Sequence, residues 1–324
     1  MTAQERIASL STPSWTLAAL AASVDSGLVA ALDEPREIGE LADRTGLTAE
    51  VVLALVDVLA TMDLAERIGE HWVAGPDLEP AMHEPHFGRL RDDLRTTVLQ
   101  GLALVTAARV EPKALGRWRH TDEQLLQAQG RLSASVIALL ADVLFPHVPG
   151  LLDRLRSESG AFLDVGAGVA AVSIAMCRHY PAIRAVGLEP AAAPLELARR
   201  NVAAAGLRDR VELRERRVEE LDDEAAFDVA WLPGSFLAAE TFALALRAVH
   251  RSLRPGGLLL SGTLDPTGDD AEAAVTRLRL TLWGGGIVAP DDVVAMVQAA
   301  GYVDVAAVPR QSGRLVPVYA RRAR

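Results

Sequence analysis

Apolar residues recur at helical spacing through the N-terminal third of the chain. The pattern predicts a helix over residues 16–32, a second over 37–45 that Gly46 ends, and a third over about 49–62 that Thr48 caps. Residues 64–73 read as two short strands with Gly69 near the tip of a hairpin. The order helix, helix-turn-helix, hairpin is typical of a winged helix; a small helical bundle is the alternative.

The helical pattern continues from residue 93 to residue 156. Its strongest part covers residues 122–144, and Pro146 and Pro149 break it. We interpret residues 1–95 as a winged-helix-like dimerisation domain and residues 96–157 as a helical connector that contributes to a substrate pocket.

Short apolar strands alternate with helical patterns from residue 160 onward. Strands are expected at 162–165, 184–188, 211–214, 227–232 and 258–262, with helices at 170–179, 194–205 and 240–253. This alternation predicts a parallel sheet covered on both faces. Strands at 303–308 and 315–320, joined through Ser312 and Gly313, are expected to form a terminal antiparallel hairpin, with Pro317 indicating an edge position.

Charge and cysteine usage narrow the classes of partner. The formal net charge is −10, and the candidate recognition helix at residues 48–60 has no Lys or Arg. Such a helix is poorly suited to hold phosphates or read bases. We therefore expect no nucleic-acid partner and a homodimer formed through the N-terminal domain. Cys177 is the only cysteine, and we recognise neither a signal peptide nor an apolar run of membrane length, so we expect a cytoplasmic protein without a membrane partner.

A glycine-rich turn follows the first strand of the second half. The strand ends at Asp164, Gly166 and Gly168 come next, and a helical pattern begins at once. Glycine allows a sharp turn and close approach of a ligand to the backbone, and the helix start offers unpaired N–H groups. The second strand ends at Glu189, where a carboxylate can accept hydrogen bonds from a ribose. The pattern predicts a nucleoside-bearing cofactor.

The turn departs from the nicotinamide fingerprint, because Ala171 stands where the third glycine of Gly-x-Gly-x-x-Gly would be. Instead, the chain resembles the class I S-adenosylmethionine-dependent methyltransferases, in particular the small-molecule O-methyltransferase-like group with an N-terminal winged-helix dimerisation domain. The resemblance is firmest over residues 162–206, in the turn at 252–257 and in the run 291–302. It implies an α/β fold in which residues 158–324 form a Rossmann-like catalytic domain.

The resemblance also implies roles for individual residues, with S-adenosyl-L-methionine as the cofactor. Asp164 would face its ammonium group, Glu189 would hold the ribose hydroxyls and Pro190 would lie beside the adenine. The full set of implied cofactor residues is Asp164, Gly166, Ala167, Gly168, Glu189, Pro190, Arg217, Val218, Trp231 and Leu232.

The residues themselves leave other roles open. Asp164 would also serve as a helix N-cap, Glu189 as a solvated strand-end carboxylate, and the glycines as a tight turn alone. Two positions depart from the family pattern. Ala170 stands where the methyltransferase motif has its third glycine, and alanine is a residue that a helix tolerates. Arg217 stands where the family usually has an acidic residue near the adenine, unless Glu219 takes that role from a shifted register.

The chemistry of the acceptor is less constrained. Many members of the group carry a histidine base after the fourth strand, but residues 231–237 contain none. Three explanations stay open: an intrinsically nucleophilic N, C or acidic O acceptor, which we favour; a base from the helical segment, His147 or His120; or a reaction other than methylation. Asp265 is a further candidate after the fifth strand, whereas His250 is expected on a helix away from the pocket.

Three residues, Ser235, Phe236 and Trp283, are expected to line a substrate pocket, and we find no metal-ligand spacing. The sequence therefore predicts a methyltransferase of the EC 2.1.1 class that acts on a small molecule of secondary metabolism. The alternatives are a non-methylating enzyme of the same fold, a ligand-responsive winged-helix regulator and an NAD-dependent oxidoreductase.

Overall fold

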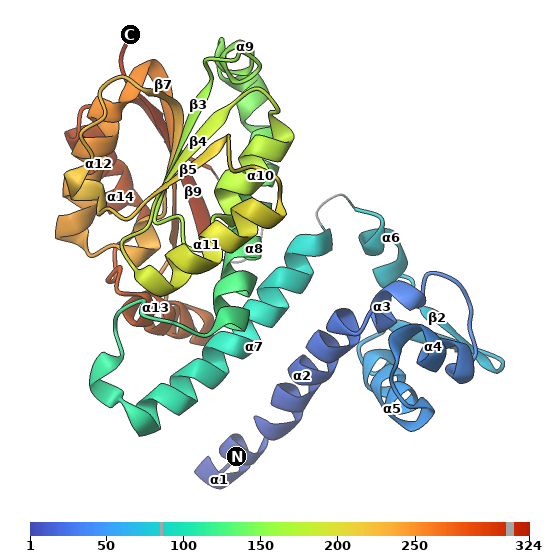
Figure 1. Ribbon diagram of the computed structural model, residues 1–324. Helices are drawn as coiled ribbons and strands as arrows, with labels where there is room; N and C mark the ends of the chain where they lie inside the picture. The colour runs from blue at the N-terminus through green and yellow to red at the C-terminus, as the bar shows by residue number, and fades with distance from the viewer. Residues whose placement is uncertain (85–86, 309–313) are drawn as a thin grey trace. The chain divides into compact units, whose positions relative to one another are not determined.

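The chain forms two compact units, Met1–Ala103 and Leu104–Arg324, in a computed structural model that describes residues 1–84, 87–308 and 314–324 (Figure 1). The division lies within the long helix α7 (Phe87–Val110), the helix that also contains residue 95, where the sequence places its boundary.

The N-terminal unit is mainly helical, with one small hairpin. Gly46, at φ 71°, ends α4, and the Thr48 side chain accepts the Val51 N–H at the start of α5, as the sequence predicts. Gly27, in the left-handed region at φ 81°, splits the helix expected over residues 16–32 into two. The elements are α1 (Ala3–Ala8), α2 (Ser11–Asp25), α3 (Leu28–Ala31), α4 (Ile38–Thr45), α5 (Ala49–Ala60), β1 (Ala65–Ile68), β2 (His71–Ala74) and α6 (Leu78–Met82).

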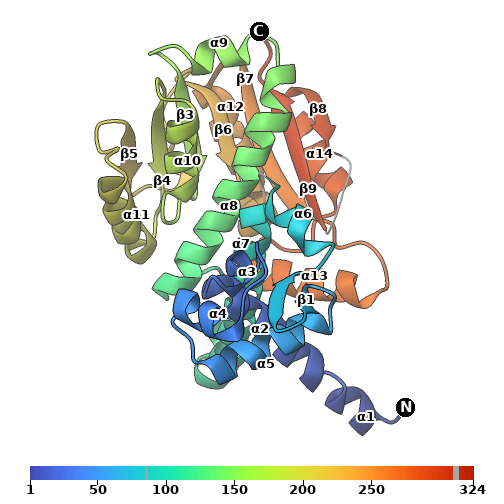
Figure 2. The ribbon, with the colours of Figure 1, turned by 90° about the vertical axis from the view of Figure 1, so that its right-hand side faces the viewer.

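A seven-stranded sheet in the order β5-β4-β3-β6-β7-β9-β8 organises the second unit, and Figure 2 shows β5 and β8 at its two edges. β3 to β7 are parallel to one another, whereas β9 runs antiparallel to both of its neighbours. The strands are β3 (Ala161–Val165), β4 (Arg184–Leu188), β5 (Val211–Arg214), β6 (Phe227–Leu232), β7 (Leu253–Leu264), β8 (Val303–Ala307) and β9 (Leu315–Arg321).

Helices cover both faces of this sheet, as the near-continuous apolar strands require (Figure 1). One face packs against α8 (Glu123–Val143), α9 (Leu151–Leu155), α10 (Ala171–His179) and α11 (Ala192–Ala204). The other packs against α12 (Ala239–Ser252) and α14 (Pro290–Ala299), and α13 (Ala271–Trp283) lies between them in sequence. Cys177 on α10 is fully buried in the first of these cores, where burial raises the pKa of its thiol.

The position of Pro317 corrects one expectation. β9 lies between β7 and β8, so the strand that contains Pro317 is not at the edge of the sheet. The Val308 N–H donates to the Pro317 carbonyl at 2.8 Å, directly beyond the last pair of the β8–β9 ladder, Ala307 and Val318. Proline lacks an N–H, and this lack is tolerated at Pro317 because it lies just beyond the last β8–β9 pair. Ser312 and Gly313 lie outside the described residues.

Two helical stretches are long and apolar enough to cross a membrane by length and composition alone, whereas the sequence predicts no such run. One covers Ala3–Asp25 and the other Glu123–His147. The second stretch contains α8, whose residues Val136, Ile137 and Leu140 belong to the core, so packing accounts for its apolar character. In the first stretch, only 6% of its most apolar 18-residue segment is buried.

Candidate cofactor and substrate site

The sheet changes direction at β3, and this topology decides where a ligand can bind. From β3 the chain proceeds outward through β4 and β5, then returns to β6 and β7 on the other side. A crevice opens outside the carboxyl ends of strands at such a switch point. A cavity of about 570 Å³ lies there, and its wall includes the ends of β3, β4 and β6.

Asp164 is next to last in β3 and only 1% exposed, yet it contributes to the cavity wall. Its Oδ2 accepts the backbone N–H of Ser173 at 3.1 Å and the Ser173 hydroxyl at 2.7 Å. Burial raises the pKa of Asp164 to about 7, while the bonds from Ser173 act in the opposite direction. The strand-end carboxyl thus caps the first turn of α10, the alternative role considered from the sequence, and also faces the cavity.

Glu189 directly follows β4 and is 8% exposed, so it is not a solvated carboxylate. Its Oε2 accepts the Gly168 N–H at 3.0 Å, and its Oε1 accepts the Ala191 N–H at 2.8 Å. Burial raises its pKa, and these two backbone bonds oppose the shift. Each oxygen retains a further lone pair for a ligand.

The loop between β3 and α10 owes its shape to residues in the left-handed region. Gly166, Gly168 and Ala170 have φ values of 67°, 55° and 62°. Backbone conformation, not crowding, requires the glycines, because the nearest atom to a Cβ on Gly166 would be 3.9 Å away. The sequence predicts a helix that begins at Ala170, but the structure places this residue outside α10. It precedes α10 in a conformation that costs an L-residue roughly 1–2 kcal/mol.

Nine of the ten cofactor residues expected from the sequence lie on the cavity wall: Asp164, Gly166, Ala167, Gly168, Glu189, Pro190, Arg217, Val218 and Trp231. Leu232 is fully buried among core residues and lies outside the wall. Arg217 and Glu219 both belong to the wall, and both side chains are exposed.

An aromatic array stands beside this wall. Phe236 lines the cavity, and Trp283 stacks behind it with ring centroids 5.0 Å apart. Trp118 also lines the cavity and meets Phe236 edge-on at 4.9 Å. Ser235 is buried in the 3-10 turn Gly234–Phe236 and does not reach the wall. One of the three expected substrate-pocket residues therefore lies on the wall, and a second supports it from behind.

The structure separates the candidate bases. His120 lies on the cavity wall and packs edge-on against Trp118 at 4.5 Å. It is half-buried, and burial lowers the pKa of its imidazole, an effect that Asp122 partly opposes. His147 is exposed and away from the wall. His250 packs edge-on against Tyr302 at 4.8 Å, away from the cavity as expected.

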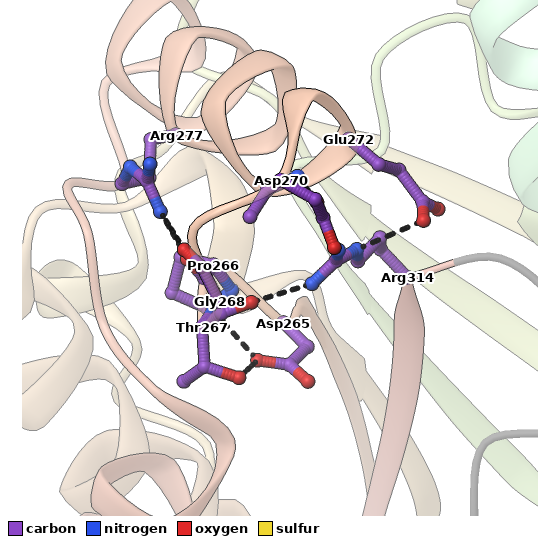
Figure 3. Close-up of polar contacts among 9 residues, drawn as sticks. Asp265, Pro266, Thr267, Gly268, Asp270, Glu272, Arg277 and Arg314 are labelled. Atoms are coloured by element: carbon purple, nitrogen blue, oxygen red, sulfur yellow. Dashed lines mark hydrogen bonds and ion pairs between the residues drawn. The ribbon is translucent and has the colours of Figure 1, made fainter.

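Asp265 lies in a polar turn after β7 (Figure 3). It is not among the residues that line the cavity. One of its oxygens accepts the Thr267 N–H at 2.9 Å and the Thr267 hydroxyl at 2.5 Å. Arg314 donates to the Thr267 carbonyl at 2.6 Å and to Asp270 at 2.8 Å, which ties this turn to β9. The geometry fits the capping of a turn.

From the sequence, we expect the helical connector to contribute to the pocket, without naming any of the α8 residues that line the cavity. Leu126, Gln129, Gly130 and Ser133 all line the cavity. The one available signal was Gly130, a helix-breaking residue in the middle of a long helical pattern. Within residues 1–84, 87–308 and 314–324, no group of three or more His, Cys, Asp or Glu side chains could hold a metal ion.

Comparisons with known proteins relate the second half of the chain to methyltransferases. Residues 162–257 match a family described as methyltransferase domain. The release factor glutamine methyltransferase of Cereibacter sphaeroides is 29% identical over 177 residues, which are 52% of this chain and 62% of that protein. The aclacinomycin 10-hydroxylase RdmB of Streptomyces purpurascens is 36% identical over 148 residues, 43% of this chain and 38% of that protein. The chain spans less than two thirds of these relatives.

A solved structure covers much more of the chain. Human N-acetylserotonin methyltransferase, in complex with S-adenosylmethionine, superposes with a TM-score of 0.64 at 15% identity, over 100% of this chain and 99% of that one. At this identity the likeness concerns the fold. Residues 162–257 thus match a methyltransferase domain, and the chain as a whole shares the fold of a solved methyltransferase that binds S-adenosylmethionine.

Proposed function

We propose that the protein transfers a methyl group from S-adenosylmethionine to a small molecule of secondary metabolism. One observation carries the proposal: two buried carboxylates and a left-handed glycine loop meet at the switch point of a methyltransferase domain. Bound S-adenosylmethionine would supply an electrophilic methyl group on a sulfonium. The protein would contribute orientation, proximity and exclusion of water.

The residues present fit this cofactor. Glu189 has lone pairs left on both oxygens to accept two ribose hydroxyls, in addition to its bonds from Gly168 and Ala191. Both bonds that Asp164 accepts from Ser173 fall on Oδ2, so Oδ1 is the atom to receive an ammonium group. Such charge-assisted bonds are shorter and stronger than neutral ones.

The acceptor we propose is a planar aromatic compound. Trp118 and Phe236 line the cavity and meet edge-on, and Trp283 stacks on the Phe236 ring. Aromatic side chains can stack on the ring of a planar aromatic acceptor or meet it edge-on, which adds to the gain from burial alone. His120 stands on the same wall, with its pKa lowered by burial, and is therefore neutral and able to accept a proton near pH 7. This geometry favours His120 among the three explanations left open by the sequence.

The proposal is tested first at the cofactor. In a calorimetric titration, S-adenosylhomocysteine should bind with micromolar affinity and NADH should not bind. Glu189→Ala should weaken binding about ten-fold or more, because two charge-assisted bonds to the ribose are lost. Glu196→Ala, on the exposed face of α11, is the matched control and should bind like the wild type. Equal affinities for wild type and Glu189→Ala would refute the assigned role.

Cofactor affinity should also depend on pH through Asp164. The pKa of Asp164 is about 7, so this carboxyl is mostly protonated at pH values below 7. An ammonium group binds the carboxylate form, which therefore becomes available as the pH rises. The dissociation constant for S-adenosylhomocysteine should therefore fall several-fold between pH 6 and pH 7.5. Asp164→Asn keeps an acceptor for the Ser173 N–H, so the cap is retained while the pH dependence disappears. The same pH profile in wild type and variant would contradict this assignment.

His120 is tested by turnover. His120→Gln should reduce kcat about 100-fold for phenols of ordinary acidity and far less for acceptors already ionised at the assay pH, with S-adenosylhomocysteine affinity unchanged. A labelled-methyl assay over a panel of phenols, amines and keto acids provides the measurement. A uniform loss for all acceptors would argue against proton transfer. Cofactor binding without methyl transfer to any acceptor would instead favour non-methylating chemistry, which the named activity of RdmB makes relevant.

The proposed partner is a second copy of this chain. Ile7 on α1, Leu10 just before α2 and Trp15 on α2 are 72%, 65% and 76% exposed, and Ser23 is the one residue of α2 that is buried. Large apolar side chains that are exposed close together mark surfaces that contact other proteins. Light scattering should give about twice the 34.5 kDa of one chain, and Trp15→Glu should shift the mass toward the monomer. A wild-type monomer at micromolar concentration would contradict the dimer.

A further inference from the structure

Gly130 lies in the interior of α8, where a glycine costs roughly 0.5–1 kcal/mol relative to alanine. Its surroundings explain why a larger residue is excluded. A Cβ at this position would lie 2.4 Å from Cγ2 of Val169 and 3.2 Å from Cβ of Ala171. Val169 is 1% exposed and β-branched, so it cannot easily turn away. The bare backbone of α8 therefore rests directly on the loop that follows β3.

A pair of amides fastens the same contact. Gln127 on α8 and Asn201 on α11 exchange two hydrogen bonds, each 3.1 Å long. The Asn201 side chain also donates to the Val169 carbonyl at 2.9 Å. One turn away on α8, Glu123 pairs with Arg200 at 3.1 Å, an exposed contact that adds little. Through Asn201, the position of α8 is thus coupled to the backbone of the loop itself.

Both sides of this contact face the cavity. Leu126, Gln129 and Ser133 line it from α8, Val169 lines it from the loop, and Ala171 lines it from the start of α10. A shift of α8 would therefore move one wall of the cavity relative to the loop that the proposed cofactor needs. An in-line displacement is sensitive to such a shift, since a displacement of about 1 Å can cost about 100-fold in rate.

We propose that Gly130 is a positioning residue, which seats α8 on the glycine loop so that the acceptor wall and the cofactor site form one rigid assembly. The inference rests on the proposed function. The Gln127–Asn201 pair holds α8 in this seat, and Gly130 permits the close approach. Neither residue transfers a proton or contacts the methyl group.

The experiment compares Gly130→Ala with a variant in which the opposing side chain is shortened. Gly130→Ala should raise the dissociation constant of S-adenosylhomocysteine about ten-fold and lower kcat more than it changes the KM of the acceptor. Gly130→Ala combined with Val169→Ala should regain affinity to within about three-fold of Val169→Ala alone, because the 2.4 Å contact with Cγ2 of Val169 is removed and only the milder 3.2 Å contact with Ala171 remains. Gly101→Ala is the matched control: Gly101 is exposed in α7, a Cβ there meets nothing within 4 Å, and binding should be unchanged.

Failure of the proposed function and failure of the positioning role of Gly130 give different results. If the wild type fails to bind S-adenosylhomocysteine, the proposed function fails. If the wild type binds and Gly130→Ala binds equally well, or if the shortened Val169 restores nothing in a folded protein, the positioning role is overturned. Should Gly130→Ala not fold, Gln127→Ala replaces it. That variant should weaken binding about three-fold or more, and wild-type affinity there would likewise overturn the role.

Discussion

Two buried carboxyl groups hold the loop on which the rest of the site depends. Asp164 at the end of β3 binds the first turn of α10, and Glu189 at the end of β4 binds the Gly168 amide. Because the strands are parallel neighbours, both groups emerge at the same edge of the sheet. Each carboxyl accepts hydrogen bonds from backbone N–H groups that fix the loop, and each can accept further hydrogen bonds from a ligand. Structure and recognition therefore share the same two side chains.

Much of this arrangement could be predicted from the sequence because it is local. β4, β5 and β6 begin and end at the residues that the sequence predicts, since the alternation of short strands with helices is a local signal. Asp164 and Glu189 then follow from the topology, because each stands at the carboxyl end of a strand. Gly46 and Thr48 likewise mark helix boundaries through backbone requirements that act within a few residues.

The remaining features depend on contacts between distant parts of the chain. Nothing near Trp118 in the sequence indicates that its ring meets Phe236, which lies after β6. The same holds for His120, whose charged neighbours suggest a surface position although its ring is half-buried on the cavity wall. Pro317 misleads for a related reason: a proline is normally excluded from an inner strand, and only the point at which the β8 ladder ends makes it acceptable.

The buried position of Cys177 gives the molecule an internal reporter. As the sole cysteine, placed on α10 directly after the cofactor loop and with its thiol pKa raised by burial, it is shielded from alkylating reagents while the core stays closed. The rate of its modification would therefore follow the transient opening of that helix. Any compound that occupies the crevice would slow this reaction in proportion to its affinity, so ligands can be ranked without knowledge of the reaction catalysed.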